Sequence, residues 1–275
     1  MKLTSKILLV ISFLMIAGLF ASNLILKRQY DAIDKTDNYW TYNRVLEQPF
    51  LHLNITGGNG TNIYYEQNPK SSVRLLQEWV KYHGSRVKTY VKNDTLYLNF
   101  DYTPANAFEK FWLQRASPVR IFSPQLLSVT GNNTHFEMLK LKQKSVTINM
   151  SGRSKFEIES MYPELDSITV TQSDSSRVIV EMSPDYRKKP SQAERQGKRQ
   201  FQITAGEVIV YSPQNDFNES MSINSVTANI KDHSILDIGH AQIKKLNVNV
   251  SDSSAIVLSG GTLRKSYVGT SSTRQ

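Results

Sequence analysis

The chain has 275 residues, and its 33 Lys and Arg against 24 Asp and Glu give a formal net charge of +9. This length suits one large domain or two small ones. The sequence contains no cysteine, which excludes disulfides, thiolate metal sites, a cysteine nucleophile and a lipid-modified N-terminal cysteine.

The N-terminal segment is strongly apolar. Ile7 to Leu26 forms an apolar run with few polar interruptions, and a helix of this length spans about 30 Å, the hydrocarbon thickness of a bilayer. A cleaved signal peptide is the alternative, but a cut after Ala21 or after Ser22 would leave a large apolar residue at position −3. We therefore predict that residues 1–28 are an uncleaved membrane anchor. The rest of the chain would then lie outside the cytoplasm, in the periplasm or at the cell surface.

The positive charge is concentrated in two places. Residues 1–28 carry four basic side chains and no acidic one, and residues 187–199 carry six basic side chains and one acidic one. The remainder is electrically balanced, which argues against a nucleic-acid-binding surface. We predict a solvated basic loop at 184–200, and a contact with anionic lipid or acidic glycan is the alternative.

Four segments of the C-terminal half align without gaps, at successive offsets of 22, 58 and 20 residues. A period of 20–22 residues with two short strands per unit is typical of a stacked β-solenoid. The four segments are Ser145–Ile158, Ser167–Val180, Ser225–Ile238 and Lys245–Leu258.

Alternate positions of these segments are apolar. Of the 20 positions that would face one side, 19 hold apolar residues, and Gln172 is the exception. Stacking the units at about 4.8 Å per rung would bury this side in one continuous core. We predict an all-β fold, a single-stranded parallel β-helix or solenoid, with an N-terminal transmembrane helix and short helical inserts.

The opposite side of the first strand in each unit holds only Thr and Asn. A solvated β surface, a glycan- or surface-binding face, and a regular hydroxyl array that matches a repeating lattice are three interpretations of this pattern. We treat the eight positions as a candidate binding face. They are Thr147, Asn149, Thr169, Thr171, Thr227, Asn229, Asn247 and Asn249.

The N-terminal half shows a less regular β pattern with two helix candidates. Strands are predicted at Leu51–Ile55, Asn62–Tyr65, Val87–Val91 and Thr95–Phe100, the last two as a hairpin, and helices at Val73–Tyr82 and Ala105–Arg115, the latter with Phe108, Phe111 and Trp112 on one side. The predicted organisation is a membrane anchor (1–28), a juxtamembrane connector (29–46), an irregular β part (47–122) and the solenoid repeats (123–268).

The polar turns contain carboxylates in equivalent positions: Asp174, Asp232 and Asp252. Stacked carboxylates about 5 Å apart could bind calcium or act as an acid/base pair, although each aspartate is explained by capping its own turn. The five histidines form no ligand-spaced pair, and no P-loop or G-x-S-x-G motif is present. We predict no catalytic residue, no cofactor and no metal.

Several stretches of the chain resemble the family named "putative autotransporter adhesin, head GIN domain", which is common in Bacteroidetes. They are FLHLNITGGNGTNIYYEQ, KNDTLYLNF, SVTINMSGRSKFEI and LNVNVSDSSAIVL, and the resemblance covers residues 46–260. It implies an exported β-helical protein of unknown molecular function, and the family name implies adhesion. The helical insert at 105–115 and the basic loop depart from the family.

Together these patterns predict a non-catalytic extracytoplasmic module of the cell envelope, with a binding or structural role such as adhesion or glycan binding. The alternative is a carbohydrate-active β-helix enzyme, a polysaccharide lyase or hydrolase that uses the turn aspartates. A third hypothesis is an accessory protein of envelope signalling whose partner sits in the same membrane. The predicted partners are the membrane, through Ile7–Leu26, and a glycan or an envelope protein, but no nucleic acid; the oligomeric state is left open.

Overall fold

The computed structural model describes residues 3–83, 86–101, 107–139, 141–159, 165–181, 222–239, 241–258 and 267–270. The predicted basic loop at 184–200 lies outside these residues. The chain divides into two compact units, Met1–Asn43 and Arg44–Gln275.

The helices and strands follow in chain order. They are α1 (Leu3–Asp31), β1 (Tyr42–Leu46), β2 (His52–Thr56), β3 (Ile63–Gln67), β4 (Ser72–Leu76), α2 (Gln77–His83), β5 (Val87–Lys92), β6 (Thr95–Phe100), α3 (Ala107–Ala116), β7 (Val119–Ser123), β8 (Ser128–Asn132), β9 (His135–Leu139), β10 (Ser145–Ser151), β11 (Lys155–Glu159), β12 (Ser167–Gln172), β13 (Arg177–Glu181), β14 (Ser222–Ile230), β15 (Ile235–Gly239), β16 (Gln242–Val250), β17 (Ala255–Leu258) and β18 (Tyr267–Thr270).

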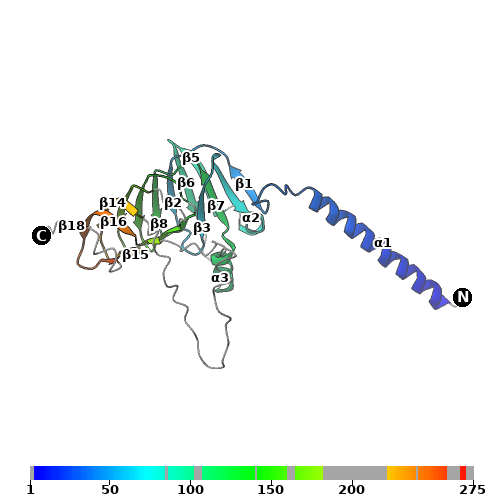
Figure 1. Cartoon of the computed structure of the whole chain (residues 1–275). Coiled ribbons are helices and arrows are strands. Elements are labelled where there is room, and N and C mark those ends of the chain that lie inside the picture. The colour runs from blue at the N-terminus through cyan, green and yellow to red at the C-terminus, as the bar shows by residue number, and fades with distance from the viewer. Residues whose placement is uncertain are drawn as a thin grey trace, which may run out of the picture. The chain divides into compact units, whose positions relative to one another are not determined.

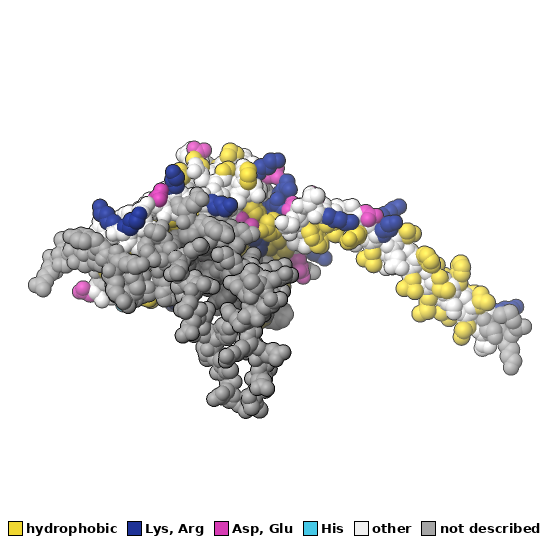
Figure 2. Space-filling view, viewed as in Figure 1, with side chains coloured by type: hydrophobic (Ala, Val, Ile, Leu, Met, Phe, Trp, Pro, Cys, Tyr) yellow, Lys and Arg dark blue, Asp and Glu magenta, His cyan; other side chains and the backbone are white. Residues whose placement is uncertain are grey.

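Helix α1 contains the whole predicted apolar run and ends at Asp31, beyond the predicted end of the anchor at 28. Apolar side chains lie exposed along its surface (Figure 2). From Lys6 to Asp31 the helix is long and apolar enough to cross a membrane, and a signal sequence would have the same properties. An apolar surface of this extent is stable in a bilayer rather than in water.

The second unit is built from two largely parallel sheets (Figure 1). The strand order is β1-β4-β7-β3-β9-β11-β13-β15-β17 in one sheet, called sheet A here, and β18-β16-β14-β12-β10-β8-β2-β6-β5 in the other, sheet B. In the repeats, each rung consists of one strand of sheet B followed by one strand of sheet A, joined by a short polar turn, whereas β6 and β7 are connected through α3. The chain is therefore mostly β, with two largely parallel sheets, as in a β-solenoid.

The strand register follows the sequence repeat. Val146 pairs with Ile168, which pairs with Val226, which pairs with Leu246. These four side chains are at most 2% exposed, and the other positions on the predicted apolar side are buried in the same core or packed against it. The four partly buried ones, Val248, Val250, Ile256 and Leu258, all belong to the rung formed by β16 and β17.

Gln172, the polar exception on the apolar side, is 1% exposed. Its Nε2 donates to the backbone carbonyl of Ser176, at 3.1 Å, and to that of Ile235 on the next rung, at 3.0 Å. A buried N–H donor is tolerated where it finds such acceptors. This side chain therefore ties two rungs together inside the core.

A column of buried hydroxyls runs through the polar turns. Ser154, Ser176 and Ser234 occupy the same turn position on three rungs and are each at most 3% exposed. The backbone N–H of Thr134 donates to Ser154 Oγ at 3.2 Å, and Ser154 Oγ donates to the carbonyl of Ser151 at 2.5 Å. The hydroxyls of Ser176 and Ser234 lie 3.3 Å apart. These serines thus give hydrogen-bond partners to polar backbone groups that would otherwise be buried without one.

Gly131 occupies one of the two core positions of β8, opposite Met150 of β10. A Cβ added to Gly131 would lie 2.5 Å from Thr134 Cγ2 and 2.7 Å from Met150 Sδ. The neighbouring side chains thus fill the space that a side chain at position 131 would need.

The order of the rungs differs from the order of the chain. The first rung, formed by β2 and β3, pairs in parallel on one side with β8 and β9 and on the other side with β6 and β7. Both sheets therefore continue from the segment predicted as irregular (47–122) into the repeats. Antiparallel strands flank this end, since β4 pairs with β7 and β5 pairs with β6.

One predicted helix is partly wrong. Residues 72–76 overlap the helix predicted at Val73–Tyr82 but form strand β4, and α2 begins only at Gln77. Val73 and Leu75, at alternate positions of β4, are buried in the core, and β4 pairs with β7. Pairing with this strand therefore overrides the helical pattern of the sequence.

The hairpin of β5 and β6 is confirmed, and the helix predicted at Ala105–Arg115 is present as α3 (Ala107–Ala116). Asn93 and Asp94 form the hairpin turn with φ values of 49° and 55°, which these residue types tolerate. On α3, Phe111 is 52% exposed, whereas Leu113 is 1% exposed. Helix α3 packs through Leu113 and, in part, Trp112.

Candidate functional site

The eight predicted Thr and Asn positions lie together on the outer face of sheet B. Strands β10, β12, β14 and β16 each contribute two of them, and the parallel register aligns the eight side chains in two rows. All eight are exposed or partly exposed. One row is Thr147, Thr169, Thr227 and Asn247, and the other is Asn149, Thr171, Asn229 and Asn249.

The structure extends both rows across β8, β2 and β6, which the repeat did not include. We call the two extended rows together the polar ladder. Register adds Ser128, His52 and Thr95 to the first row and Thr130, Asn54 and Tyr97 to the second. Within the ladder, His52 Nδ1 and Ser128 Oγ lie 2.7 Å apart.

The second row ends in two stacked tyrosines. Tyr97 of β6 pairs with Tyr90 of β5, and their rings lie 4.9 Å apart at an interplanar angle of 10°. Tyr90 is 47% exposed. The pair offers a flat apolar surface with hydroxyl groups at its edge, next to the amides and hydroxyls of the ladder.

The strands beneath the polar ladder are unusually poor in charge. No described strand of sheet B contains Asp or Glu, and β2, β6, β8, β10, β12 and β14 contain no Lys or Arg either. Among these described strands, only β5 and β16 carry lysines. The ladder can therefore donate and accept hydrogen bonds along its length with little electrostatic preference.

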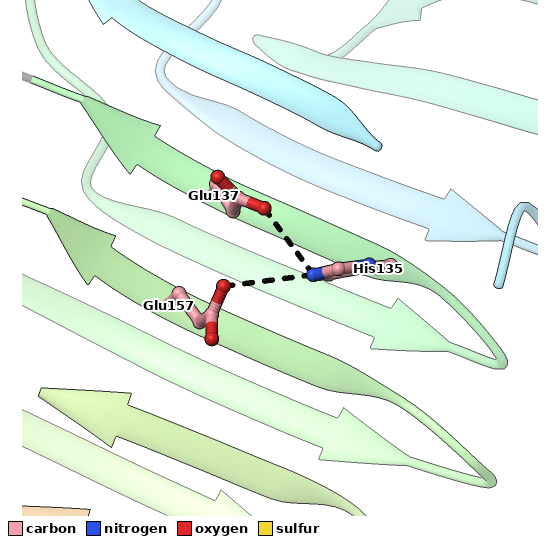
Figure 3. Close-up of side chains that lie close together, drawn as sticks. All are labelled: His135, Glu137 and Glu157. Atoms are coloured by element: carbon pink, nitrogen blue, oxygen red, sulfur yellow. Dashed lines mark ion pairs between the residues drawn. The ribbon is translucent and has the colours of Figure 1, made fainter. Parts of the chain in front are cut away.

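The outer face of sheet A is charged instead, and it carries ion pairs, of which Arg120–Glu66 is partly buried and Arg177–Asp237 is more exposed. Arg120 Nη1 lies 2.5 Å from Glu66 Oε1, and Arg177 Nη2 lies 3.2 Å from Asp237 Oδ2. Between these pairs lies a cluster of His135 and Glu137 on β9 with Glu157 on β11 (Figure 3).

In this cluster, His135 Nε2 points toward both carboxylates. The Nε2 atom lies 3.3 Å from Glu137 Oε1 and 3.6 Å from Glu157 Oε2, and Lys155 Nζ lies 2.5 Å from the other oxygen of Glu157. The side chains of His135, Glu137 and Glu157 are 19%, 13% and 20% exposed, respectively.

These neighbours shift two pKa values. Burial opposes the charged form of His135, but Glu137 and Glu157 outweigh it, so that the pKa of His135 lies above its ordinary value of 6.5. Interaction with His135 lowers the pKa of Glu157 to about 2, against the effect of burial and with further help from Lys155.

Sequence reasoning missed this cluster because it considered histidines only in pairs with one another. The available signal was His-x-Glu on a strand, which places both side chains on one face, with a second Glu at the equivalent position of the next rung. Within the described part of the chain, this is the group of three potential metal ligands whose ligand atoms all lie within 4.8 Å of one another. The structure does not test the prediction of no metal.

The turn aspartates lie where the repeat placed them. Asp174 and Asp232 have the same left-handed conformation, with φ values of 58° and 56°, and both are exposed, as is Asp252. Ser173 Oγ donates to Asp174 Oδ2 at 3.0 Å, a bond within the turn itself. Among the described residues, none of the three aspartates belongs to the ligand group described above.

No protein-family model and no curated protein matches the chain. Its fold is similar to those of several solved structures. A "putative adhesin" from Bacteroides fragilis is 13% identical, with a TM-score of 0.43, over 79% of this chain and 95% of the other. A "putative lipid binding protein" from Parabacteroides distasonis is 13% identical, with a TM-score of 0.30, over 80% of this chain and 94% of the other. A "putative adhesin" from Parabacteroides merdae is 10% identical, with a TM-score of 0.31, over 82% of this chain and 94% of the other. At these TM-scores the likeness carries no conclusion about the function of this chain.

Proposed function

We propose that this protein is a non-catalytic binding module of the cell envelope that holds an uncharged glycan on the polar ladder. The observation that carries the proposal is the pair of registered rows of Thr, Asn and Ser side chains that ends in the stacked Tyr90 and Tyr97. Sugars expose hydroxyl groups around an apolar ring face, and such a surface complements both parts.

The regular spacing of the ladder supports a polymer rather than a small ligand. Parallel strands repeat at about 4.8 Å, so each row presents one hydrogen-bonding side chain per rung. One exposed hydrogen bond contributes only about 0.5–1.5 kcal/mol net. A chain of sugars that contacts many rungs at once gains affinity from repetition.

The lack of Asp and Glu on the described strands of sheet B, and of Lys and Arg between β6 and β14, supports an uncharged ligand and argues against catalysis at this face. Glycoside hydrolysis needs a pair of carboxylates beside the scissile bond. Since no described strand of sheet B contains Asp or Glu, the ladder has no such pair. An acidic polysaccharide would find basic side chains only at the two ends of the ladder, on β5 and β16, and none on the described strands between them.

Helix α1 supports a place at a membrane, with Ile7–Leu26 as the anchor and the Arg44–Gln275 unit outside the cytoplasm. The resemblance to head GIN domain proteins agrees with such a location. Fractionation of cells tests the anchor: the protein should sediment with membranes, and its intact mass should include residues 1–28. A soluble product that lacks them would instead make α1 a signal peptide.

The binding test uses the full-length protein in detergent on an array of neutral and acidic glycans. We expect retention on neutral polysaccharides. It should fall at least tenfold when the second row is replaced (Asn149→Ala, Thr171→Ala, Asn229→Ala and Asn249→Ala together) and also in Tyr90→Ala. The matched control is Asn59→Ala, an exposed asparagine in the turn after β2.

Three outcomes would overturn the proposal. Equal retention of wild type and row variants would remove the ladder as the site. Turnover of a glycan, abolished by Asp232→Asn and Asp252→Asn, would establish the enzyme alternative. Co-purification of one membrane protein without retention on any glycan would favour the signalling accessory.

A further inference from the structure

We propose that His135, Glu137 and Glu157 bind a divalent transition-metal cation of the zinc type on the outer face of sheet A. This inference is independent of glycan binding, because it concerns the opposite sheet and different residues. It departs from the sequence-based prediction of no metal site.

The backbone holds the three side chains in one place. Strands β9 and β11 are parallel neighbours inside sheet A, with Glu137 opposite Glu157 and His135 opposite Lys155. Between the outward-facing residues, Phe136 and Phe156 point into the core, where both are fully buried and their rings lie 5.7 Å apart. Ligands on packed strands keep their relative positions better than ligands on loops.

The separations of the ligand atoms fit a metal. Zinc binds His nitrogen at about 2.0–2.1 Å and carboxylate oxygen at about 2.0–2.2 Å in tetrahedral geometry, so two ligand atoms lie roughly 3.3–3.6 Å apart. The two measured distances from His135 Nε2, 3.3 and 3.6 Å, fall in this range. The third pair of ligand atoms lies within 4.8 Å, which a small rotation of either carboxylate would shorten.

The nitrogen itself lacks an ordinary partner. His135 Nε2 is shielded from solvent and makes no hydrogen bond of ordinary geometry with the described residues, although Glu137 Oε1 and Glu157 Oε2 lie 3.3 and 3.6 Å away. A bare nitrogen lone pair beside two carboxylates is electrostatically unfavourable. A cation between the three atoms would satisfy all of them, and a proton on Nε2 is the competing occupant.

The charge and chemistry of the cluster favour a transition metal over calcium or magnesium. With neutral His135, the two carboxylates and Lys155 leave a net charge of −1. Lys155 occupies Oε1 of Glu157 and leaves Oε2 for the metal. An imidazole ligand suits zinc, copper or nickel, whereas calcium and magnesium prefer oxygen ligands alone. Three protein ligands leave a fourth position for water.

The test measures Zn²⁺ binding to the untagged full-length protein in detergent by competition with a chromophoric chelator. We expect one Zn²⁺ per chain and at least tenfold weaker binding for Glu137→Gln and Glu157→Gln. The matched control is Glu66→Gln, which removes a carboxylate from the same face of sheet A; it should bind as wild type does. Co²⁺ should give the intense visible absorption of a tetrahedral site in wild type and not in Glu137→Gln.

Wild type that binds no Zn²⁺ in this competition would overturn the proposal and leave the proton as the occupant. Unchanged affinity in Glu137→Gln and Glu157→Gln would assign the metal to other residues and overturn it as well. Should a variant unfold, the Co²⁺ spectrum of wild type decides alone, because an octahedral spectrum contradicts the proposed ligand set. Loss of glycan binding by ladder variants has no bearing on any of these results.

Discussion

The side chain of Gln172 on β12 donates to the backbone carbonyl of Ile235, far along the chain on the next rung, at a distance of 3.0 Å. The bond lies inside the core, where every equivalent position on the other described rungs is apolar or glycine. A polar residue in the apolar repeat thus marks a place where two rungs are joined by a side chain as well as by the strand ladder.

Replacing this amide with an apolar group of similar size should weaken the stack. We expect Gln172→Leu to lower the free energy of unfolding by about 1 kcal/mol, because the buried carbonyls of Ser176 and Ile235 lose a donor. Urea denaturation followed by circular dichroism measures the change. The control is the neighbouring Thr171→Ala on the exposed face, which should stay within about 0.5 kcal/mol of wild type. Equal values for the two variants would mean that the amide contributes nothing.

The buried hydroxyl column should matter more than exposed serines do. Ser154→Ala leaves the backbone N–H of Thr134 without its acceptor, so we expect a loss of about 1–2 kcal/mol. Ser145→Ala, at the exposed start of β10, is the comparison and should change the stability by less than about 0.5 kcal/mol. Denaturant titration of both variants decides, and similar losses would contradict a structural role for the column.

The close packing around Gly131 predicts that substitutions at Gly131 and Thr134 affect stability jointly. Gly131→Ala should cost about 1–3 kcal/mol, since the new Cβ would overlap Thr134 Cγ2 and Met150 Sδ. Thr134→Ser removes the nearer of these atoms and keeps the hydroxyl, as in the serines of the following rungs. The double variant should therefore be more stable than Gly131→Ala alone. Strict additivity of the two changes in a double-mutant cycle would refute this contact.

Stability in alkali should depend on Tyr65. Its hydroxyl is buried and donates to the carbonyl of Ser123 at 3.2 Å. Burial raises the pKa of Tyr65 from 10.0 to about 12, although a hydrogen bond with Ser123 opposes the shift. Because the folded pKa lies above the unfolded one, the associated stability is complete below pH 10 and is lost between pH 10 and 12.

Comparison with Tyr65→Phe isolates this effect. Above pH 10, wild type should lose stability relative to the variant by about 1.4 kcal/mol per pH unit. Urea titrations at pH 9, 10.5 and 11.5 measure the difference between the two proteins. A difference that stays constant over this range would mean that Tyr65 ionises normally in the folded state.

The inside of the solenoid could be predicted from the sequence, because alternation is a local property of a strand. Val146, Ile168 and Val226 lie in one buried column as the repeat indicated. The position of the β2–β3 rung, between the β6–β7 rung and the β8–β9 rung, could not be predicted in this way. It depends on which strand edges are unpaired when the segment that contains β6, α3 and β7 adds to the sheets. The local sequence pattern does not contain this information.

The Thr and Asn rows could be predicted from the sequence, but the cluster of His135, Glu137 and Glu157 could not, for a related reason. The Thr and Asn rows repeat without gaps, so their alignment followed from the sequence. The rung of β8 and β9 departs from this regularity: Thr147 pairs with Ser128 and Lys155 pairs with His135, so the connection between the two strands is shorter by a single position than in the following rung. This difference hid the alignment of Glu137 with Glu157, and it also hid the continuation of the ladder through Ser128 and Thr130.

Because sheet A carries more charge on its outer face than sheet B, contacts made by the two sheets should differ in their dependence on salt concentration. At physiological ionic strength, exposed charges are screened beyond about 8 Å. Attraction through the charged side of sheet A would therefore weaken as a medium becomes saltier, whereas contacts made by the uncharged rows of sheet B would persist. If the polar ladder binds the proposed neutral glycan, that binding should change little with the salt concentration of the medium.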